Sequence, residues 1–431
     1  MSERRLRIAF FSDLTGSDSL SSHCSRLLLP RLNQRLAIEA FSDSFASQVH
    51  GVPHHHYLKA YQRHRDEPFD LFFYQLEDGR RSRFVRSSIG IVPGVTWFHD
   101  LFFLDLGPEA THTSPWEHSI KQFYDSSLPF ADRSVAPHQL WPRAYRELSL
   151  SPLNLFTSQW ALTESQTMLS NRIEGELGAH ASECLKVPIE LGEQAPLPSR
   201  STLRVVALCG TGLESRAHKL LAALRGLSHP WHLTWVVEGG DLRAAEMLLR
   251  EFEAGERVTL ATGSSPTEWS KLLASAHVAV HLRTSCFGHL APHLQLSLAS
   301  GRLTVISDMA QGEDLPEGVA CKVTPGISEA SQLRSILAGA CEIDISAATA
   351  PARSYVASEH SPDKIAQQLI RLLSEAAVLL RAPMRRWEEL YKNARSELLR
   401  EVSNLMGSAA DAGLAPFSRV MSPAVDELFS R

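Results

Sequence analysis

A glycine turn followed by two cations is the first feature of this sequence that could bind a charged ligand. Gly210 and Gly212 separate an apolar strand pattern from a helical pattern, and Arg216 and Lys219 follow shortly after. The N-terminus of a helix presents unpaired backbone N–H groups, and together with cationic side chains it stabilises phosphate charge. The sequence therefore predicts a phosphate-binding turn here. The alternative is that both cations are solvated charges of an ordinary helix.

A histidine ends another apolar strand pattern. His99 lies in the sequence WFHD and is followed directly by Asp100. An imidazole ring can hydrogen-bond a hydroxyl group in either protonation state, which suits the recognition of a hydroxyl-bearing ligand. The alternative is a histidine that packs at the strand end and bonds to backbone. We expect Asp100 to cap or anchor the loop that follows.

Alternating strand and helix patterns position these residues. In the first half, strands are predicted at 6–11, 37–41, 69–75 and 94–98, with a polar loop at 12–22 and a helix at 24–36. This alternation predicts an α/β fold with a parallel sheet and helices on both faces. The ligand of such a sheet binds at the carboxyl ends of its strands.

The pattern restarts after a proline-rich stretch, which predicts a second doubly wound sheet. Strands are expected at 203–208, 232–237, 258–261, 278–282 and 303–307. The predicted division is a first Rossmann-like domain at 1–192, a linker at 193–202, a second Rossmann-like domain at 203–380 and a C-terminal helix and tail at 381–431. A ligand is expected in the cleft between the two halves.

The bulk composition excludes several classes of protein. The chain has 431 residues, of which 44% are hydrophobic and 21% charged, and its net charge is −5 without a basic block. This is ordinary globular composition and disfavours a nucleic-acid-binding surface. The six cysteines form no C-x-x-C pair, which argues against a zinc knuckle and suits a reducing, cytoplasmic location. Neither a signal peptide nor an apolar run of membrane-spanning length is present in the sequence.

Two further features leave alternatives open. The C-terminal helical region is basic, which could attract anionic lipid and place the protein peripherally at the inner membrane face, or could be a solvated helix. Its cations are Arg381, Arg385, Arg386, Lys392, Arg395 and Arg400. The run His54–His56 could bind a metal, but three adjacent residues cannot all face one point, so no metal site is predicted.

Four stretches of the chain resemble the family-4 glycosyltransferases, specifically the bacterial branch that builds surface polysaccharides. They are FSDLTGSDSLSSHCSRLLLPRL at 11–32, the two segments within 69–106, ALCGTGLESRAHKLLAAL at 207–224, and the stretch at 278–323. The resemblance implies the GT-B fold, in which two Rossmann-like domains face a central cleft. It also implies transfer of a sugar from a nucleotide-sugar donor to a glycan, lipid-linked or protein acceptor. Such transfer retains the anomeric configuration and needs no metal or other cofactor.

The resemblance assigns roles to individual residues. Arg216 takes the position of the family's phosphate-binding cation, with Lys219 one turn on, and His99 is the catalytic-site residue that contacts the donor sugar. A donor-binding carboxylate is expected near GEDLPEG, as Glu313 or, when the Leu-Pro pairs are aligned, Asp314; the alternative is a solvated turn. The acceptor-side loop would contain Ser19, Ser21 and His23, together with Asp100.

Two departures from the family's pattern affect the donor site. The family's glutamate loop is replaced by Gly288-His289-Leu290-Ala291-Pro292-His293, so that His289 stands in the carboxylate's position and Pro292 removes a backbone donor. Leu20 replaces a glycine that lets the backbone approach the donor. Either His289 or His293 supplies the lost contacts in an active enzyme, or the protein is an inactive GT-B partner subunit of a glycosyltransferase or a glycan-binding module.

Overall fold

The computed structural model describes residues 4–14, 19–44, 49–101, 144–170, 181–211, 216–237, 241–262, 265–283 and 292–380. Residues 1–376 form one compact unit, and residues 377–431 form a second, of which only residues 377–380 are described. Among the described residues, no helix combines the length and the apolar character needed to cross a membrane.

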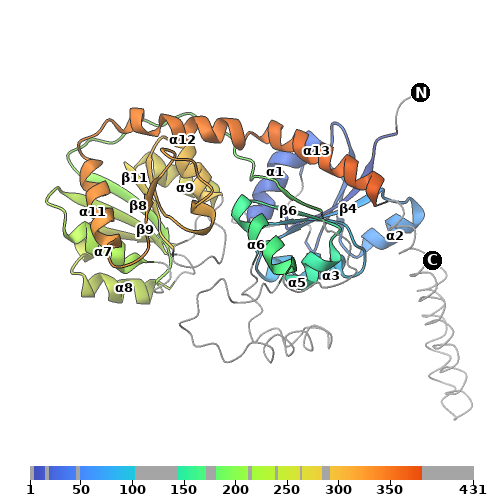
Figure 1. Ribbon diagram of the computed structural model, residues 1–431, viewed down its shortest axis with the longest axis horizontal. Coiled ribbons are helices and arrows are strands. Elements are labelled where there is room, and N and C mark those ends of the chain that lie inside the picture. Colours follow the sequence, from blue (N-terminus) through green and yellow to red (C-terminus); the bar gives the residue numbers. More distant parts are fainter. Residues whose placement is uncertain are drawn as a thin grey trace, which may run out of the picture. The chain divides into compact units, whose positions relative to one another are not determined.

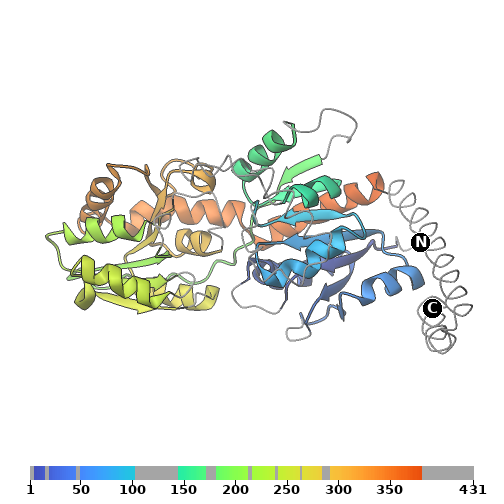
Figure 2. The same cartoon turned by 90° about the horizontal axis from the view of Figure 1, so that it is seen from below.

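The first sheet has seven parallel strands in the order β3-β2-β1-β4-β5-β6-β7. Figures 1 and 2 show this sheet, in blue to green, with helices beside it. Its central strands are buried along their whole length, which explains their continuous apolar sequences. The strands are β1 (Arg7–Phe11), β2 (Ala37–Ser42), β3 (His54–His56), β4 (Leu71–Leu76), β5 (Val95–Phe98), β6 (Leu153–Phe156) and β7 (Ala181–Cys184).

The helices that accompany this sheet include α1, which begins where a serine caps it. Ser19 is extended, and its side chain accepts a hydrogen bond from the backbone N–H of Ser22. The described elements are α1 (Leu20–Leu32), α2 (Lys59–Asp66), the short helix η1 (Arg80–Ser82), α3 (Arg83–Ile89), α5 (Tyr145–Leu150) and α6 (Gln159–Ser170). The predicted helix at 24–36 therefore starts four residues too late, because the serine-rich sequence was interpreted as loop rather than as a cap.

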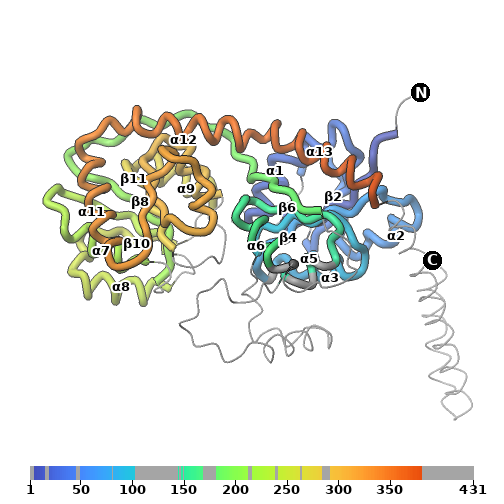
Figure 3. The backbone as a smooth tube through the Cα atoms, in the orientation of Figure 1, coloured from blue at the N-terminus to red at the C-terminus, as the bar shows by residue number. Residues whose placement is uncertain are grey.

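The second sheet has six parallel strands in the order β10-β9-β8-β11-β12-β13. Its strands are β8 (Leu203–Cys209), β9 (Trp231–Val237), β10 (Val258–Ala261), β11 (Val278–His281), β12 (Leu303–Ser307) and β13 (Cys321–Val323). Its helices are α7 (Ala217–Arg225), α8 (Leu242–Glu251), η6 (Gly255–Arg257), α9 (Pro266–Ala274), α10 (His293–Ala299), η7 (Ala310–Gly312), α11 (Glu329–Gly339) and α12 (Ile345–Glu359). The helix α13 (Pro362–Leu379) instead contacts elements of the first sheet: Arg31 of α1 donates to Asp363 at 2.7 Å, and Gln368 donates to Cys184 O of β7 at 3.0 Å. The chain path through these elements can be followed in Figure 3.

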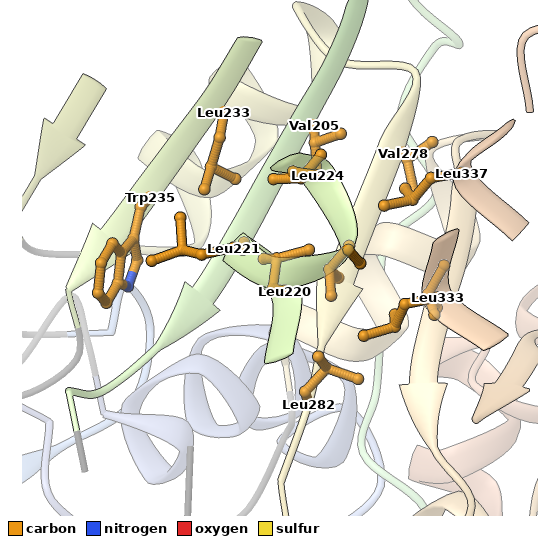
Figure 4. Close-up of a cluster of buried hydrophobic side chains, with 14 of the residues drawn as sticks. Val205, Leu220, Leu221, Leu224, Leu233, Trp235, Val278, Leu282, Leu333 and Leu337 are labelled. Atoms are coloured by element: carbon orange, nitrogen blue, oxygen red, sulfur yellow. The ribbon is translucent and has the colours of Figure 1, made fainter. Parts of the chain in front are cut away.

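Alternation along the strands sends side chains to two separate cores. Val205 and Ala207 join a cluster with helices α7, α8 and α11, whereas Val206 and Leu208 join a second cluster with Trp269 of α9. Figure 4 shows the first cluster, in which the leucines of α7 lie against strands β8 and β9 and the leucines of α11. The second sheet is therefore covered on both faces, as a parallel sheet requires.

The two sheets confirm the predicted α/β class with two Rossmann-like parallel sheets. In each, the first six strands follow the order 3-2-1-4-5-6, the doubly wound arrangement. All nine predicted strands are present, and those at 258–261 and 303–307 have the predicted bounds. The four short strands β3, β6, β7 and β13 were missed because they are three or four residues long and β3 and β7 are polar. The domain boundaries stay a prediction, and the predicted C-terminal helix and tail at 381–431 lie outside the described residues.

Candidate functional site

Each sheet has one point where the strand order reverses, and ligands of such sheets bind outside the carboxyl ends of the strands at that point. In the first sheet it lies between β1 and β4, and in the second it lies between β8 and β11. Ser12 and Glu77 follow the two strands of the first pair, and Gly210 and Leu282 follow those of the second. Of the residues singled out in the sequence, Gly210 lies at the second of these edges.

A chain of buried polar side chains crosses the first edge. The Oγ atoms of Ser12 and Ser25 lie 2.8 Å apart, and Gln75 Nε2 donates to Ser25 Oγ at 2.8 Å. At the other end of the amide, Gln75 Oε1 lies 2.8 Å from His99 Nε2. Ser12, Ser25 and Gln75 are fully buried and His99 nearly so. Burial strengthens these hydrogen bonds and makes a missing partner costly, so the chain holds its members in fixed orientations.

His99 follows the last residue of β5, at the edge where the sequence predicts it. Its backbone N–H donates to Leu76 O at 2.8 Å, and its ring centroid lies 4.6 Å from that of Trp97. The side chain bonds to the amide of Gln75 rather than to backbone through Nε2. A side-chain partner differs from the alternative stated above, in which the ring of His99 bonds to backbone. The contact of His99 with a donor sugar stays a prediction.

The N-terminus of α1 carries an internal carboxylate. Glu77 Oε2 accepts hydrogen bonds from the backbone N–H of Ser21 at 2.7 Å and from its hydroxyl at 2.8 Å. A carboxylate at this end of a helix is stabilised by the unpaired N–H groups and by the helix dipole. Ser19 and Ser21, which were predicted to contact the acceptor, thus make capping contacts within the protein. Leu20 between them is fully buried and has no positive φ angle, so it occupies the core without backbone strain.

The two other residues predicted for the acceptor side also have internal partners. His23 Nε2 donates to Pro188 O at 3.0 Å, and burial lowers the pKa of His23 from 6.5 to about 4. Asp100 Oδ2 accepts from the backbone N–H of Asp78 at 2.7 Å. Asp100 therefore anchors the loop after β4, whereas the expectation was that it anchors the loop that follows Asp100 itself.

Carboxylates gather at this carboxyl edge of the first sheet. Asp13, Asp43, Glu77, Asp78 and Asp100 follow strands β1, β2, β4 and β5. Burial raises the pKa of Asp43, and the nearby charge of Asp13 raises it further. Carboxylates accept hydrogen bonds from hydroxyl groups and repel phosphates, whereas the charge of Arg81 near Asp43 partly offsets this effect.

In the second half of the chain, Arg216 forms a partly buried ion pair with Glu329. Its Nε lies 2.9 Å from Oε2 and 3.1 Å from Oε1 of Glu329, and its Nη2 also donates to Oε2. Glu329, the first residue of α11, is fully buried and accepts a further hydrogen bond from Gly326 N at 3.2 Å. Arg216, the predicted phosphate-binding cation, is thus already paired with a carboxylate, and no pattern in the sequence indicated this partner.

The rest of the predicted phosphate-binding turn is described in part. Gly210 ends the β8 segment, and the neighbouring carbonyl of Cys209 accepts from Trp235 Nε1 at 2.9 Å. Arg216 precedes α7 with a left-handed φ of 56°, which is unusual for a residue with a side chain. Lys219 lies on α7 and forms no ion pair with a described residue. Gly212 lies outside the described residues, and the roles of all four stay predictions.

Trp269 of α9 contacts two histidines: His281, which ends β11, and His293, which begins α10. Trp269 Nε1 donates to His293 O and to Ser297 Oγ, both at 3.1 Å, and His281 Nε2 lies 2.9 Å from Ser297 Oγ. Because the Ser297 hydroxyl donates to His293 O at 2.8 Å, it accepts from the other two groups. Burial lowers the pKa of His281 to about 3. His293, predicted to contact the donor, begins α10, while Gly288 and His289 lie outside the described residues.

The two candidate carboxylates in GEDLPEG have different surroundings. Glu313 is exposed, whereas both oxygens of Asp314 lie 3.0 Å from the backbone N of Trp160, in the first turn of α6. Burial raises the pKa of Asp314, and its hydrogen bonds to the α6 backbone oppose that shift. Asp314 therefore caps α6, and neither residue has lost its predicted role by this geometry alone.

Two histidines of β3 have hydrogen-bond or charge partners within the protein. His54 Nε2 lies 2.7 Å from Ser42 Oγ, and His55 Nε2 lies 3.2 Å from a carboxylate oxygen of Glu39. Successive strand residues point to opposite faces, which separates the three rings. Within the described ranges, no three His, Cys, Asp or Glu side chains approach closely enough to hold a metal ion.

Sequence reasoning missed Gln75, Glu77 and Glu329. A signal for Gln75 was available, since a polar residue within the apolar strand FDLFFYQL must find a buried partner. Glu329 gave no comparable signal, because a glutamate in the first turn of a helix is ordinary there.

The fold can be compared with solved structures. No family model and no curated protein matches the chain. HepE from Anabaena, solved with UDP and glucose, matches 86% of this chain and 100% of its own at 15% identity, with a TM-score of 0.57. Sucrose-phosphate synthase from Thermosynechococcus elongatus matches 86% and 99% at 14% identity, with a TM-score of 0.59. WaaG, a glycosyltransferase involved in lipopolysaccharide biosynthesis, matches 84% and 99% at 14% identity, with a TM-score of 0.53. This chain therefore has the GT-B fold of these glycosyltransferases.

Proposed function

We propose that this protein transfers a sugar from a nucleotide-sugar donor to a glycan, lipid-linked or protein acceptor in polysaccharide biosynthesis. The observation that carries the proposal is the pair of doubly wound sheets, which matches HepE over nearly all of that chain. HepE has also been solved with UDP-glucose, and a GT-B protein with the same two sheets has the same topological sites for such a donor.

In the proposed reaction, the second sheet's edge holds the donor diphosphate. The N-terminus of α7 and Lys219 stabilise the charge that grows on the leaving group, and Arg216 contributes when its pairing with Glu329 is exchanged for the phosphate. His99, at the edge of the first sheet, orients the sugar. We propose retention of the anomeric configuration without a metal, with the leaving phosphate taking the acceptor's proton.

A second function is favoured because the two groups that could bind an anion, the start of α1 and Arg216, are already paired with carboxylates. Glu77 occupies the backbone N–H of Ser21 at the start of α1, and Glu329 occupies Arg216 before α7. With those groups matched internally, a GT-B protein without donor chemistry could serve as the partner subunit of a glycosyltransferase or as a glycan-binding module. Function then lies in a surface of the fold rather than in the donor site.

A donor panel distinguishes the two functions. The full chain is mixed with the common nucleoside diphosphates and nucleotide sugars, and thermal unfolding and donor hydrolysis are measured. A ligand at 100 times its Kd stabilises the protein by about 2.7 kcal/mol, which raises Tm measurably. A shift with one nucleotide and hydrolysis of its sugar support transfer. Absence of any shift across the panel refutes it and favours the partner or glycan-binding function. Peripheral membrane contact rests on residues 381–400 and stays a separate proposal, tested by flotation with anionic vesicles.

A further inference from the structure

In the buried chain from Ser12 to His99, the groups around Ser12 bear on which member donates each hydrogen bond. Ser12 Oγ lies within reach of two backbone carbonyls, Asp13 O at 3.2 Å and Ser21 O at 3.4 Å, and of Ser25 Oγ at 2.8 Å. Either hydroxyl could donate the short hydrogen bond between the serines. We take Ser25 as its donor, because the Ser12 hydrogen then serves one of the two carbonyls, which can only accept.

The next link is fixed by the same reasoning. Once Ser25 donates its only hydroxyl hydrogen to Ser12, it can only accept from Gln75 at 2.8 Å. The atom of Gln75 that faces Ser25 is therefore the amide nitrogen, and the amide oxygen faces His99 at 2.8 Å. The oxygen and nitrogen of an amide look alike by shape alone, so this network argument decides the orientation.

The orientation of the amide determines where the proton of His99 lies. An amide oxygen cannot donate, so Nε2 of His99 carries the hydrogen of this bond. The neutral ring then has its lone pair on Nδ1, and the proton gained on acidification also binds there. His99 is 2% exposed and Gln75 fully buried, so water does not compete for this hydrogen bond.

We propose that Gln75 is a positioning residue that, through Ser25 and Ser12, holds the proton of His99 on Nε2 and assigns proton exchange to Nδ1. For catalysis this rests on the proposed function, in which His99 orients the donor sugar. The side chain of Gln75 comes from β4, that of Ser25 from α1 and that of His99 from the end of β5, so three elements share the control of one ring.

Nitrogen NMR of the full chain labelled with ¹⁵N-histidine tests this proposal without any donor. The His99 signals are identified by their loss in a His99→Gln variant. The expected pattern at neutral pH is that of the Nε2-protonated tautomer. Ser25→Ala and Gln75→Leu should each shift it toward the Nδ1-protonated pattern, because the directed chain is broken. Gln75→Glu should retain it, since a carboxylate still accepts from Nε2.

The control is Ser88→Ala, which removes another buried hydroxyl of the same sheet domain, bonded to Phe84 O rather than to this chain. It should leave the His99 pattern unchanged. A wild-type protein with the proton of His99 on Nδ1 overturns the proposal. An unchanged His99 pattern in Ser25→Ala also overturns it. Ser25→Ala alone provides the test if Gln75→Leu does not fold. A protein that turns over no donor but has the expected pattern supports this proposal and refutes only the proposed function.

Discussion

Arg216 and Glu329 form a two-point ion pair in which the guanidinium meets both oxygens of a fully buried carboxylate. The two residues are 113 positions apart, at the starts of α7 and α11. Opposite charges in such contact largely cancel at a distance, so the pair offers an approaching diphosphate much less attraction than a lone arginine. The pair also ties the first turns of two helices together.

Replacing Glu329 by a neutral residue should separate the effect of the ion pair on phosphate binding from its effect on stability. In Glu329→Gln the charge of Arg216 is no longer cancelled, so UDP should bind about tenfold more tightly, while Tm falls because a buried pair is broken. Arg216→Ala should lower donor turnover by about 10²-fold or more. Titration calorimetry and thermal unfolding measure both effects.

The double variant Arg216→Met/Glu329→Leu serves as the control, since replacing a whole buried pair by apolar side chains is often neutral for stability. It should regain much of the lost Tm and bind UDP weakly. If Glu329→Gln lowers Tm but leaves the affinity for UDP unchanged, the pair is purely structural and Arg216 leaves the proposed mechanism.

Asp314 provides a test of the predicted donor carboxylate. Its oxygens accept from the backbone N–H of Trp160 at the start of α6, so Asp314→Ala should cost about 1 kcal/mol of stability, as loss of a helix cap does. Asp314→Asn keeps one acceptor and should cost less. Urea unfolding measures the stability of each variant.

The same variants decide whether Asp314 also binds the donor. If capping is its only role, the KM for the donor stays unchanged in Asp314→Asn. A large rise in KM without loss of stability would instead restore the role that the Leu-Pro alignment predicts. Glu313→Ala is the matched control, because Glu313 is the exposed neighbour.

Buried histidines should make the protein less stable in mild acid. His360 Nδ1 donates to Val187 O at 2.7 Å, and burial lowers its pKa from 6.5 to about 4. Because the unfolded chain takes up this proton at higher pH than the folded one, the stabilisation is full above pH 6.5 and is lost as pH falls toward 4. The loss for one such group is on the order of 3 kcal/mol.

Denaturant unfolding of the wild type and His360→Asn at several pH values between 7.5 and 4.5 checks this expectation. Asparagine can retain the donated hydrogen bond but does not titrate, so the free energy of unfolding of the variant should fall less steeply as pH is lowered. Equal slopes for the two proteins would show that His360 does not contribute to the pH dependence.

A glycine before β5 should tolerate no side chain. A Cβ atom on Gly94 would lie 2.3 Å from the backbone oxygen of Phe72, which cannot move without distorting β4. Gly94→Ala should therefore destabilise the protein by more than about 2 kcal/mol, as overpacking of a core does. Urea unfolding measures the change.

Gly339 is the matched control for this substitution. It lies at the end of α11, and a Cβ atom there would meet nothing within 4 Å. Gly339→Ala should be neutral or stabilise by up to about 1 kcal/mol, since alanine favours the helix. Similar losses of stability in both variants would contradict the steric explanation for Gly94.

The sequence by itself determined the class of fold. Apolar strands such as 303–307 and the restart of the strand pattern after the linker at 193–202 depend on spacings of a few residues, which are visible along the chain. It also placed His99 and Gly210 correctly at strand ends, because the end of an apolar run is a local signal.

The tertiary structure alone decided which charges meet. Glu329 on Arg216, Asp314 on the start of α6 and Glu77 on the start of α1 join residues from 56 to 154 positions apart. No local pattern encodes these partners, because they arise when helices and strands pack and buried polar groups must find acceptors or donors nearby. Periodicity therefore gives the sheets, whereas packing determines which of the predicted site residues are already paired within the protein.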